Sequence, residues 1–208
     1  MTRRSPTLAL GLRAPSATSW VGAALMALGA WMVANLVGQW VLAPPPEYIE
    51  AFRRMLFPET LRRSLVVSLF LFAATPAICE EVFFRGVILR GLLTRVPPGT
   101  AIALSAAMFG IYHVDLYRLV PTTLLGGMLG FLAWRSGSVG PSILAHFLNN
   151  AVLVVLGAAG LDRRLDALGS GAKVGFLVGA ATLVALGAAV SLRARPPDEN
   201  AINGQARP

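Results

Sequence analysis

The sequence predicts an all-α polytopic membrane protein, a bundle of about six transmembrane helices. Hydrophobic residues make up 55% of its 208 residues, charged residues only 13%, and the mean hydropathy is +0.65. This composition lies outside the range of ordinary soluble domains. Several apolar stretches reach about 20 residues, the length that crosses a ~30 Å hydrocarbon core as a helix. A transmembrane barrel would instead show alternating segments of about 10 residues.

Six apolar stretches account for the predicted spans. They cover residues 20–42, 64–84 with continuation toward 93, 100–114, 116–134, 138–158 and 172–192. The stretch 100–114 is marginal in length for a crossing. Residues 44–63 join the first two spans and begin with three prolines. Within this connector, 47–57 places apolar side chains among charges at helical spacing, which indicates an amphipathic helix lying on the bilayer. A solvated loop is the alternative.

The chain is expected to have four parts. Residues 1–63 hold a basic lead, the first span and the amphipathic connector, and residues 64–158 form the membrane domain with the polar cluster described below. Residues 159–192 supply the last loop and span. Residues 193–208 are polar and proline-bearing, which predicts a disordered tail.

The net charge of +8 reflects basic flanks of membrane helices and not a nucleic-acid surface, because the lysines and arginines sit in short loops and at both ends. Apart from Arg85, nine basic residues fall on one predicted face and eight on the other, so their balance does not fix the orientation. The basic N-terminus favours both termini in the cytoplasm. We expect a multi-pass protein of a bacterial inner membrane. The single cysteine, Cys79, excludes an intrachain disulfide.

A polar cluster interrupts the apolar stretches. An ionisable group at mid-membrane depth costs about 2.5–3.5 kcal/mol and is by default a functional-site hypothesis. The cluster comprises Glu80, Glu81, Arg85, His113, His146 and Asn150. Counting ~1.5 Å per residue brings Glu80, His113 and Asn150 to one level, with His146 a turn nearer one face. Both histidines of the chain lie within apolar stretches.

Spacing within each helix assigns roles to these side chains. Glu81 and Arg85 are four residues apart and can form a structural ion pair, which leaves Glu80 free for chemistry. His146 and Asn150 share the same spacing and so present one face that carries hydrogen-bond donors.

These motifs carry a resemblance to a known family. Glu80-Glu81-x-x-x-Arg85, Phe109-x-x-x-His113 and His146-x-x-x-Asn150, in this order and each on its own apolar helix, resemble the motifs of the CAAX-protease and bacteriocin-processing (CPBP, or Abi) family of intramembrane proteases. The likeness covers roughly residues 64–156, which makes 64–158 a CPBP-like catalytic membrane domain. The resemblance implies an intramembrane endopeptidase in which Glu80 and His113 activate water. It further implies that His146 and Asn150 stabilise the oxyanion.

The resemblance also sets the expected partners and cofactors. The partners are a peptide or protein substrate, whose lipidation stays open, and the lipid bilayer, with no nucleic acid. We expect no metal and no cofactor. Zinc is the alternative, because Glu80, His113 and His146 could supply three ligands and leave the fourth position to water. A second reading of the function is a non-proteolytic scaffold or transporter-associated protein, in which the polar cluster only holds the helices together.

Overall fold

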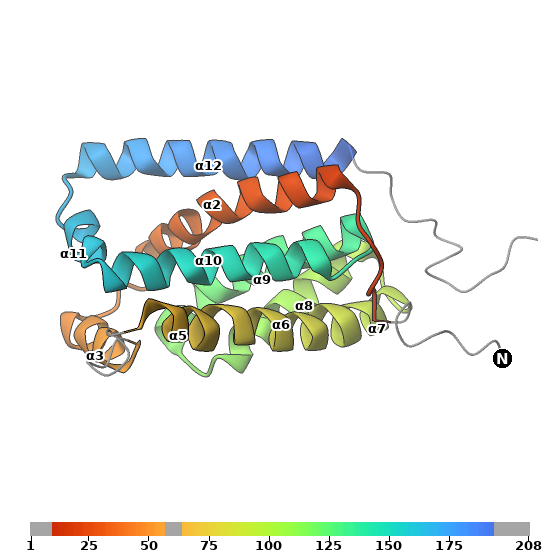
Figure 1. Ribbon diagram of the computed structural model, residues 1–208, viewed down its shortest axis with the longest axis horizontal. Helices are drawn as coiled ribbons and strands as arrows, with labels where there is room; N and C mark the ends of the chain where they lie inside the picture. Colours follow the sequence, from red (N-terminus) through yellow and green to blue (C-terminus); the bar gives the residue numbers. More distant parts are fainter. Residues whose placement is uncertain (1–9, 57–63, 194–208) are drawn as a thin grey trace, which may run out of the picture.

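A computed structural model describes residues 10–56 and 64–193, and these residues form helices and no strand (Figure 1). The helices are α2 (Ala17–Val41), α3 (Pro46–Leu56), α5 (Leu65–Leu69), α6 (Thr75–Glu81), α7 (Arg90–Leu93), α8 (Pro98–Tyr112), α9 (Leu116–Ser136), α10 (Gly140–Ala158), α11 (Leu161–Asp166) and α12 (Ser170–Arg193). Two π-helical segments, η1 (Phe70–Ala74) and η2 (Val82–Leu89), join α5, α6 and α7 into one continuous rod. The tail predicted to be disordered lies outside the described residues beyond Arg193.

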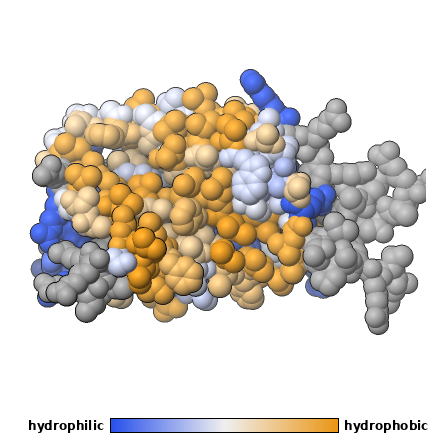
Figure 2. All heavy atoms as spheres, viewed as in Figure 1, coloured by the Kyte–Doolittle hydropathy of each residue, from blue (hydrophilic) through white to orange (hydrophobic). Residues whose placement is uncertain are grey.

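The predicted membrane bundle is confirmed. Within residues 10–56 and 64–193, five helices are long and apolar enough to cross a bilayer: Ala17–Val41, Leu65–Leu93, Leu116–Ser136, Gly140–Ala158 and Ser170–Arg193. The marginal sixth stretch is the shorter apolar helix α8. Large apolar side chains such as Val66 and Phe70 are 78% and 63% exposed, as expected of residues that face lipid. Figure 2 shows apolar residues across the middle of one face and hydrophilic residues toward its two ends.

The helices pack closely where glycines let their backbones approach. A Cβ atom on Gly126 of α9 would lie 3.1 Å from the Ala106 Cα of α8, and one on Gly130 would lie 3.2 Å from Ile102. Glycines four residues apart on one helix face commonly allow such close packing between membrane helices. A second seam joins α2 to α12, where a Cβ on Gly187 would lie 2.7 Å from the carbonyl oxygen of Gly22. A core of small and aliphatic residues from α2, α9 and α10 fills the centre.

The connector between the first two spans forms the amphipathic helix α3, so the helical interpretation of residues 47–57 is confirmed over Pro46–Leu56. Residues 57–63 lie outside the described part. α3 lies at the end of the bundle away from both described chain ends (Figure 1). It contacts the turn between α8 and α9. The Tyr48 hydroxyl donates to Asp115, and the Tyr48 ring lies 4.7 Å from that of Tyr117.

Candidate active site

The continuous helical rod from Leu65 to Leu93 carries Glu80, Glu81 and Arg85. Its backbone departs from α-helical geometry before and after the two glutamates. η1 precedes α6 and η2 follows it, so the glutamates lie between two π-helical segments. π-helical turns occur frequently at functional sites, because they change which faces of a helix its side chains occupy. Pro76 adds to the irregularity, since it has no N–H to donate to the carbonyl of Phe72, four residues earlier.

Glu81 and Arg85 form a fully buried ion pair. Arg85 Nη1 donates to Glu81 Oε1 at 2.8 Å, and both side chains are 0% exposed. Arg85 Nη2 also donates to the carbonyl of Gly126 at 3.0 Å, and the guanidinium lies 4.5 Å from the centroid of the Phe109 ring. The pair therefore neutralises two buried charges and ties the rod to α8 and α9.

His146 extends this pair toward Glu80. Its Nδ1 lies 3.0 Å from Glu81 Oε1, and its Nε2 lies 4.0 Å from Glu80 Oε2. Because a carboxylate accepts hydrogen bonds, Glu81 holds a proton on Nδ1 and directs Nε2 toward Glu80. The sequence count placed His146 one turn from Glu80. The structure brings their side chains together, and the π-helical segment η2 between Glu81 and Arg90 departs from the α-helical rise that the count assumed.

Glu80 keeps the free carboxylate that its position beside the ion pair predicts. Its side chain is 21% exposed, and Oε2 has no hydrogen-bond partner among the described residues. The 4.0 Å between Oε2 and His146 Nε2 exceeds a direct hydrogen bond. By distance alone, a separation of 4.0 Å allows one bridging polar group to lie at hydrogen-bond distance, about 2.8 Å, from both atoms.

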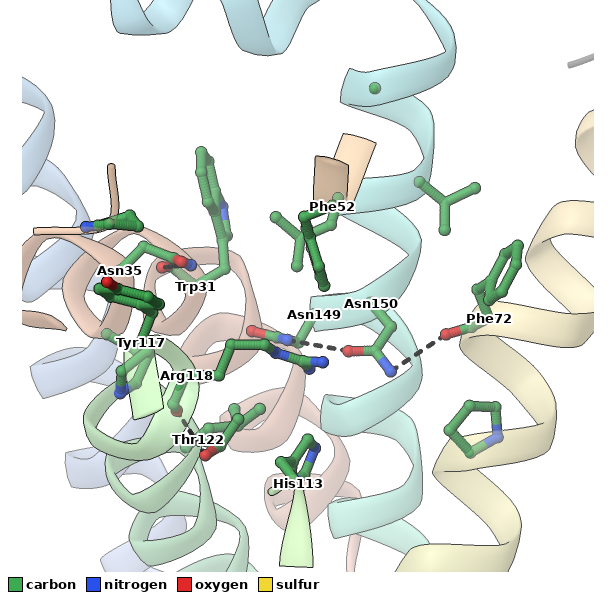
Figure 3. Close-up of a pocket in the computed structure, with 18 of the residues that line it drawn as sticks. Trp31, Asn35, Phe52, Phe72, His113, Tyr117, Arg118, Thr122, Asn149 and Asn150 are labelled. Atoms are coloured by element: carbon green, nitrogen blue, oxygen red, sulfur yellow. Dashed lines mark hydrogen bonds between the residues drawn. The ribbon is translucent and has the colours of Figure 1, made fainter. Parts of the chain in front are cut away.

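Asn150 lines the same cavity as Glu80 and His146, but one of the two N–H groups of its side-chain amide already donates to a backbone carbonyl. Its Nδ2 donates to the carbonyl of Phe72 at 3.2 Å, and its Oδ1 accepts from Asn149 at 3.2 Å (Figure 3). The carbonyl of Phe72 is the one that Pro76 cannot satisfy. The side-chain amide of Asn150 thus links α10 to η1, and its second N–H remains for a ligand.

His113 ends α8 at a strained turn. Its Nδ1 lies 2.8 Å from the carbonyl of Phe109, so Nδ1 carries the proton and Nε2 is left as a proton acceptor. The next residue, Val114, has φ 48, a left-handed conformation that a β-branched residue rarely adopts and that costs about 1–3 kcal/mol. Among the described residues, no hydrogen bond joins His113 to Glu80. The Phe109 ring packs edge-on against the rings of both His113 and His146.

The predicted catalytic residues line one cavity of about 460 Å³. Glu80, His113, His146 and Asn150 all line it, whereas Glu81 and Arg85 lie behind it. The remaining lining comes from the second half of α2, from α3 and from the first turns of α9, together with further residues of the Leu65–Leu93 rod, α8 and α10. The cavity therefore occupies the half of the bundle that carries α3 (Figures 1 and 3).

Among the lining residues that the sequence analysis did not assign to the site are Tyr48 and Arg118. Tyr48 belongs to the amphipathic connector, and Arg118 was counted as a basic flank of a span. Both sit in sequence patterns typical of a membrane surface. Only the packing of α3 onto the α8–α9 turn places them at the cavity.

The fit of a metal can be judged from the donor groups. Within 10–56 and 64–193, no group of three or more His, Cys, Asp or Glu side chains is arranged to hold a metal ion. Glu80 and His146 approach each other, and Nδ1 of His113 and Nδ1 of His146 are bound to the Phe109 carbonyl and to Glu81, which leaves Nε2 of both rings directed elsewhere. Such Nδ1 bonds also orient the histidines of metal sites, so zinc stays the alternative to a metal-free site.

Comparison with known proteins identifies the motif-bearing segment. Residues 62–152 match the family of Rce1-like type II CAAX prenyl endopeptidases. Over 79 residues, 38% of this chain, the sequence is 33% identical to the "Putative membrane peptidase YdiL" of Bacillus subtilis (strain 168). The aligned segment covers 32% of that relative, so the chain matches about a third of its length. No solved structure matches the chain. The resemblance to the CPBP family that the three motifs indicate is therefore confirmed.

Proposed function

We propose that this protein is an intramembrane endopeptidase of the CAAX-prenyl-protease and bacteriocin-processing type, which hydrolyses a peptide bond with a water molecule activated in the cavity. The observation that carries the proposal is the approach of Glu80 Oε2 and His146 Nε2 to 4.0 Å at the cavity wall. The Glu81–Arg85 pair supports this geometry from behind, because it fixes the His146 ring. The match to a prenyl endopeptidase family makes a lipidated peptide one candidate substrate.

The first chemical step is attack of water on the scissile carbonyl. Glu80 takes a proton from a water molecule held near its free oxygen, and the oxygen of that water bonds to the carbonyl carbon. His113 presents an unprotonated Nε2 to the same cavity and assists this proton transfer. The carbonyl oxygen becomes an oxyanion as the tetrahedral intermediate forms.

Donors from α10 stabilise that oxyanion. His146 donates from Nε2 when protonated, and Glu81 stabilises the resulting imidazolium through Nδ1, as a buried carboxylate does in a catalytic triad. Asn150 donates its second N–H. Collapse of the intermediate returns the proton from Glu80 to the leaving amine, which breaks the C–N bond. No step requires a metal.

The test uses the purified full-length protein in detergent, with a peptide library offered both unmodified and carrying a farnesylated cysteine, and mass spectrometry of the products. Glu80→Gln and His113→Ala are expected to abolish cleavage, and His146→Ala and Asn150→Ala to lower turnover by about 10²–10³-fold, the usual cost of an oxyanion donor. Glu47→Gln on exposed α3 is the control and should cleave at the parental rate. Full activity of Glu80→Gln would refute the assignment of the base.

Metal dependence is decided with the same preparation. We expect full cleavage in the presence of 1,10-phenanthroline and no stoichiometric zinc by elemental analysis. An inactive apo-protein restored by zinc would overturn the metal-free mechanism and make His146 a ligand. If the parent cleaves nothing while every variant of the cluster misfolds, the non-proteolytic scaffold becomes the better interpretation.

A further inference from the structure

Among the residues that the structure describes, Arg118 is a cation in the cavity wall without an ion-pair partner. It lies in the first turn of α9, is half-buried, and points into the cavity (Figure 3). Among the described residues, its guanidinium makes no hydrogen bond and no ion pair. It instead lies 5.2 Å from the centroid of the Phe52 ring on α3, a cation–π contact that orients the group without neutralising it.

The carboxylate nearest to Arg118 in sequence, that of Asp115, binds other groups. Asp115 caps α9 by accepting from the backbone N–H groups of Tyr117 and Arg118, and it accepts from the Tyr48 hydroxyl through its other oxygen. Glu80 interacts electrostatically with Arg118 across the cavity, but the two do not come within 4.0 Å. The positive charge of Arg118 is therefore available to a ligand.

Arg118 also differs from an ordinary basic flank of a membrane helix. Such side chains extend outward so that their charge reaches the lipid headgroups and water. The backbone of Arg118 is held by the cap at Asp115, and its side chain is held beneath Phe52, so the guanidinium turns inward. A cation held toward a cavity of about 460 Å³ has the position of a recognition group.

We propose that Arg118 binds a carboxylate of the substrate, which lies within a few residues of the scissile bond. The planar guanidinium fork matches a carboxylate through two parallel hydrogen bonds. Because Glu80 and Arg118 line the same cavity of about 460 Å³, one short peptide segment bound there can contact both. The carboxylate is either the free C-terminus of the peptide or an Asp or Glu side chain. This assignment rests on the proposed function for the identity of the ligand as a peptide.

Binding is measured without cleavage, on full-length Glu80→Gln protein in detergent, by microscale thermophoresis. The three probes are N-decanoyl-Ala-Val-Leu with a free carboxylate, its C-terminal amide, and N-decanoyl-Ala-Val-Glu amide. We expect the free acid or the Glu peptide to bind about 10- to 100-fold more tightly than the uncharged amide, as befits a hydrogen-bonded charge pair. Whichever of the two binds better identifies the source of the carboxylate.

Variants of Arg118 assign the preference. Adding Arg118→Gln should remove the preference for the charged probe, and Arg118→Lys should restore part of it. Arg54→Gln is the matched control, an exposed arginine on α3 outside the cavity lining, and should leave the preference unchanged. Equal binding of the acid and amide probes, or a preference that survives in Arg118→Gln, would overturn the proposal. So would an Arg118-dependent stabilisation by phosphatidylglycerol vesicles with no effect of the peptides, which would assign the site to a lipid phosphate.

The outcome is separable from that of the proposed function. A protein that binds the acid probe through Arg118 but cleaves no peptide retains the recognition site and loses the peptidase assignment. A protein that cleaves acid and amide peptides equally retains the peptidase assignment and loses the role of Arg118.

Discussion

At the scale of single residues, the fully buried charges of Glu81 and Arg85 depend on each other. Arg85 has two acceptors, the Glu81 carboxylate and the Gly126 carbonyl, and Glu81 also binds His146. Removing one partner of a buried pair leaves the other charge without compensation, which costs about 3–5 kcal/mol. We therefore expect the pair to contribute to stability, and we propose the chemical role for Glu80 beside it.

Glu81→Gln and Arg85→Leu are expected to lower the free energy of unfolding by about 3–5 kcal/mol each, because each leaves a buried charge alone. The double variant Glu81→Leu/Arg85→Leu should lose less than the sum. Thermal unfolding of the purified protein in detergent checks this, with Glu80→Gln as the control that melts like the parent. Single variants that melt at the parental temperature would show that the pair is not structural.

Sequence reasoning reached the residues of the site but not all of their contacts. The four-residue spacing identified Glu81 and Arg85 as partners, because that spacing operates within one helix. The bond from His146 to Glu81 joins two helices, and its existence depends on how each is rotated. No spacing within α10 encodes that rotation. The same limit applies to Asn150 and the carbonyl of Phe72, which Pro76 leaves available.

At the scale of elements, α2 and α12 meet through small residues. A Cβ on Gly187 would lie 2.6 Å from Met26 Cγ and 2.7 Å from the Gly22 carbonyl oxygen, whereas a Cβ on Gly179 of the same helix meets nothing within 4 Å. α12 is therefore positioned by close backbone contact on one face and exposed on another. The sequence predicted the two spans, but not that they would pack against each other.

Gly187→Ala is expected to destabilise the protein by about 1–3 kcal/mol, because the added methyl group overlaps Gly22 and Met26. Gly179→Ala is the matched control on the same helix and should be neutral or slightly stabilising, since alanine favours a helix over glycine. The melting temperatures of the two variants in detergent give the comparison. Equal melting temperatures would mean that α2 and α12 do not pack in this register.

The helix α3 is held to the bundle by Tyr48. Its hydroxyl donates to Asp115, and burial, together with that bond, raises the pKa of Tyr48 above its ordinary value. The folded protein therefore binds the phenol proton more tightly than the unfolded chain. The stabilisation is complete below pH ~10, the unfolded pKa, and is lost only as pH rises through the higher folded value.

Tyr48→Phe should loosen α3, because it removes the donor to Asp115 but keeps the ring that packs on Tyr117. We expect backbone amides of α3 to exchange with deuterium about 10-fold faster, the effect of losing one hydrogen bond to a charged group. Tyr112→Phe is the control, since Tyr112 is 58% exposed. In the parent, protection of α3 should not change between pH 7 and pH 9. Unchanged exchange in Tyr48→Phe would show that this bond does not hold α3.

At the scale of the whole molecule, the five long helices and the shorter α8 alternate in direction (Figure 1). If α8 crosses the membrane with the others, both chain ends lie on one side and α3 lies on the other. The sequence located all six apolar helices, since apolar length is a local property. It could not fix the orientation, because its basic residues divide almost equally between the two faces.

Single-cysteine variants in a Cys79→Ala background test this topology. A membrane-impermeant maleimide should label Leu12→Cys, Arg95→Cys and Arg193→Cys from one side of the membrane. It should label Glu47→Cys and Lys173→Cys from the other. Labelling of Leu12→Cys and Arg193→Cys from opposite sides would mean that α8 does not cross.

The cavity lies in the half of the bundle away from the described chain ends, so a substrate would enter it from the side of the membrane that α3 faces. If α8 crosses the bilayer, only molecules with α3 outward in a sealed proteoliposome present the cavity to a peptide in the medium, and part of the proposed activity is then latent until detergent opens the vesicle. A tag on either terminus faces the opposite compartment. Removing the outward-facing tags with an added protease would therefore mark the latent fraction and leave the working fraction untouched.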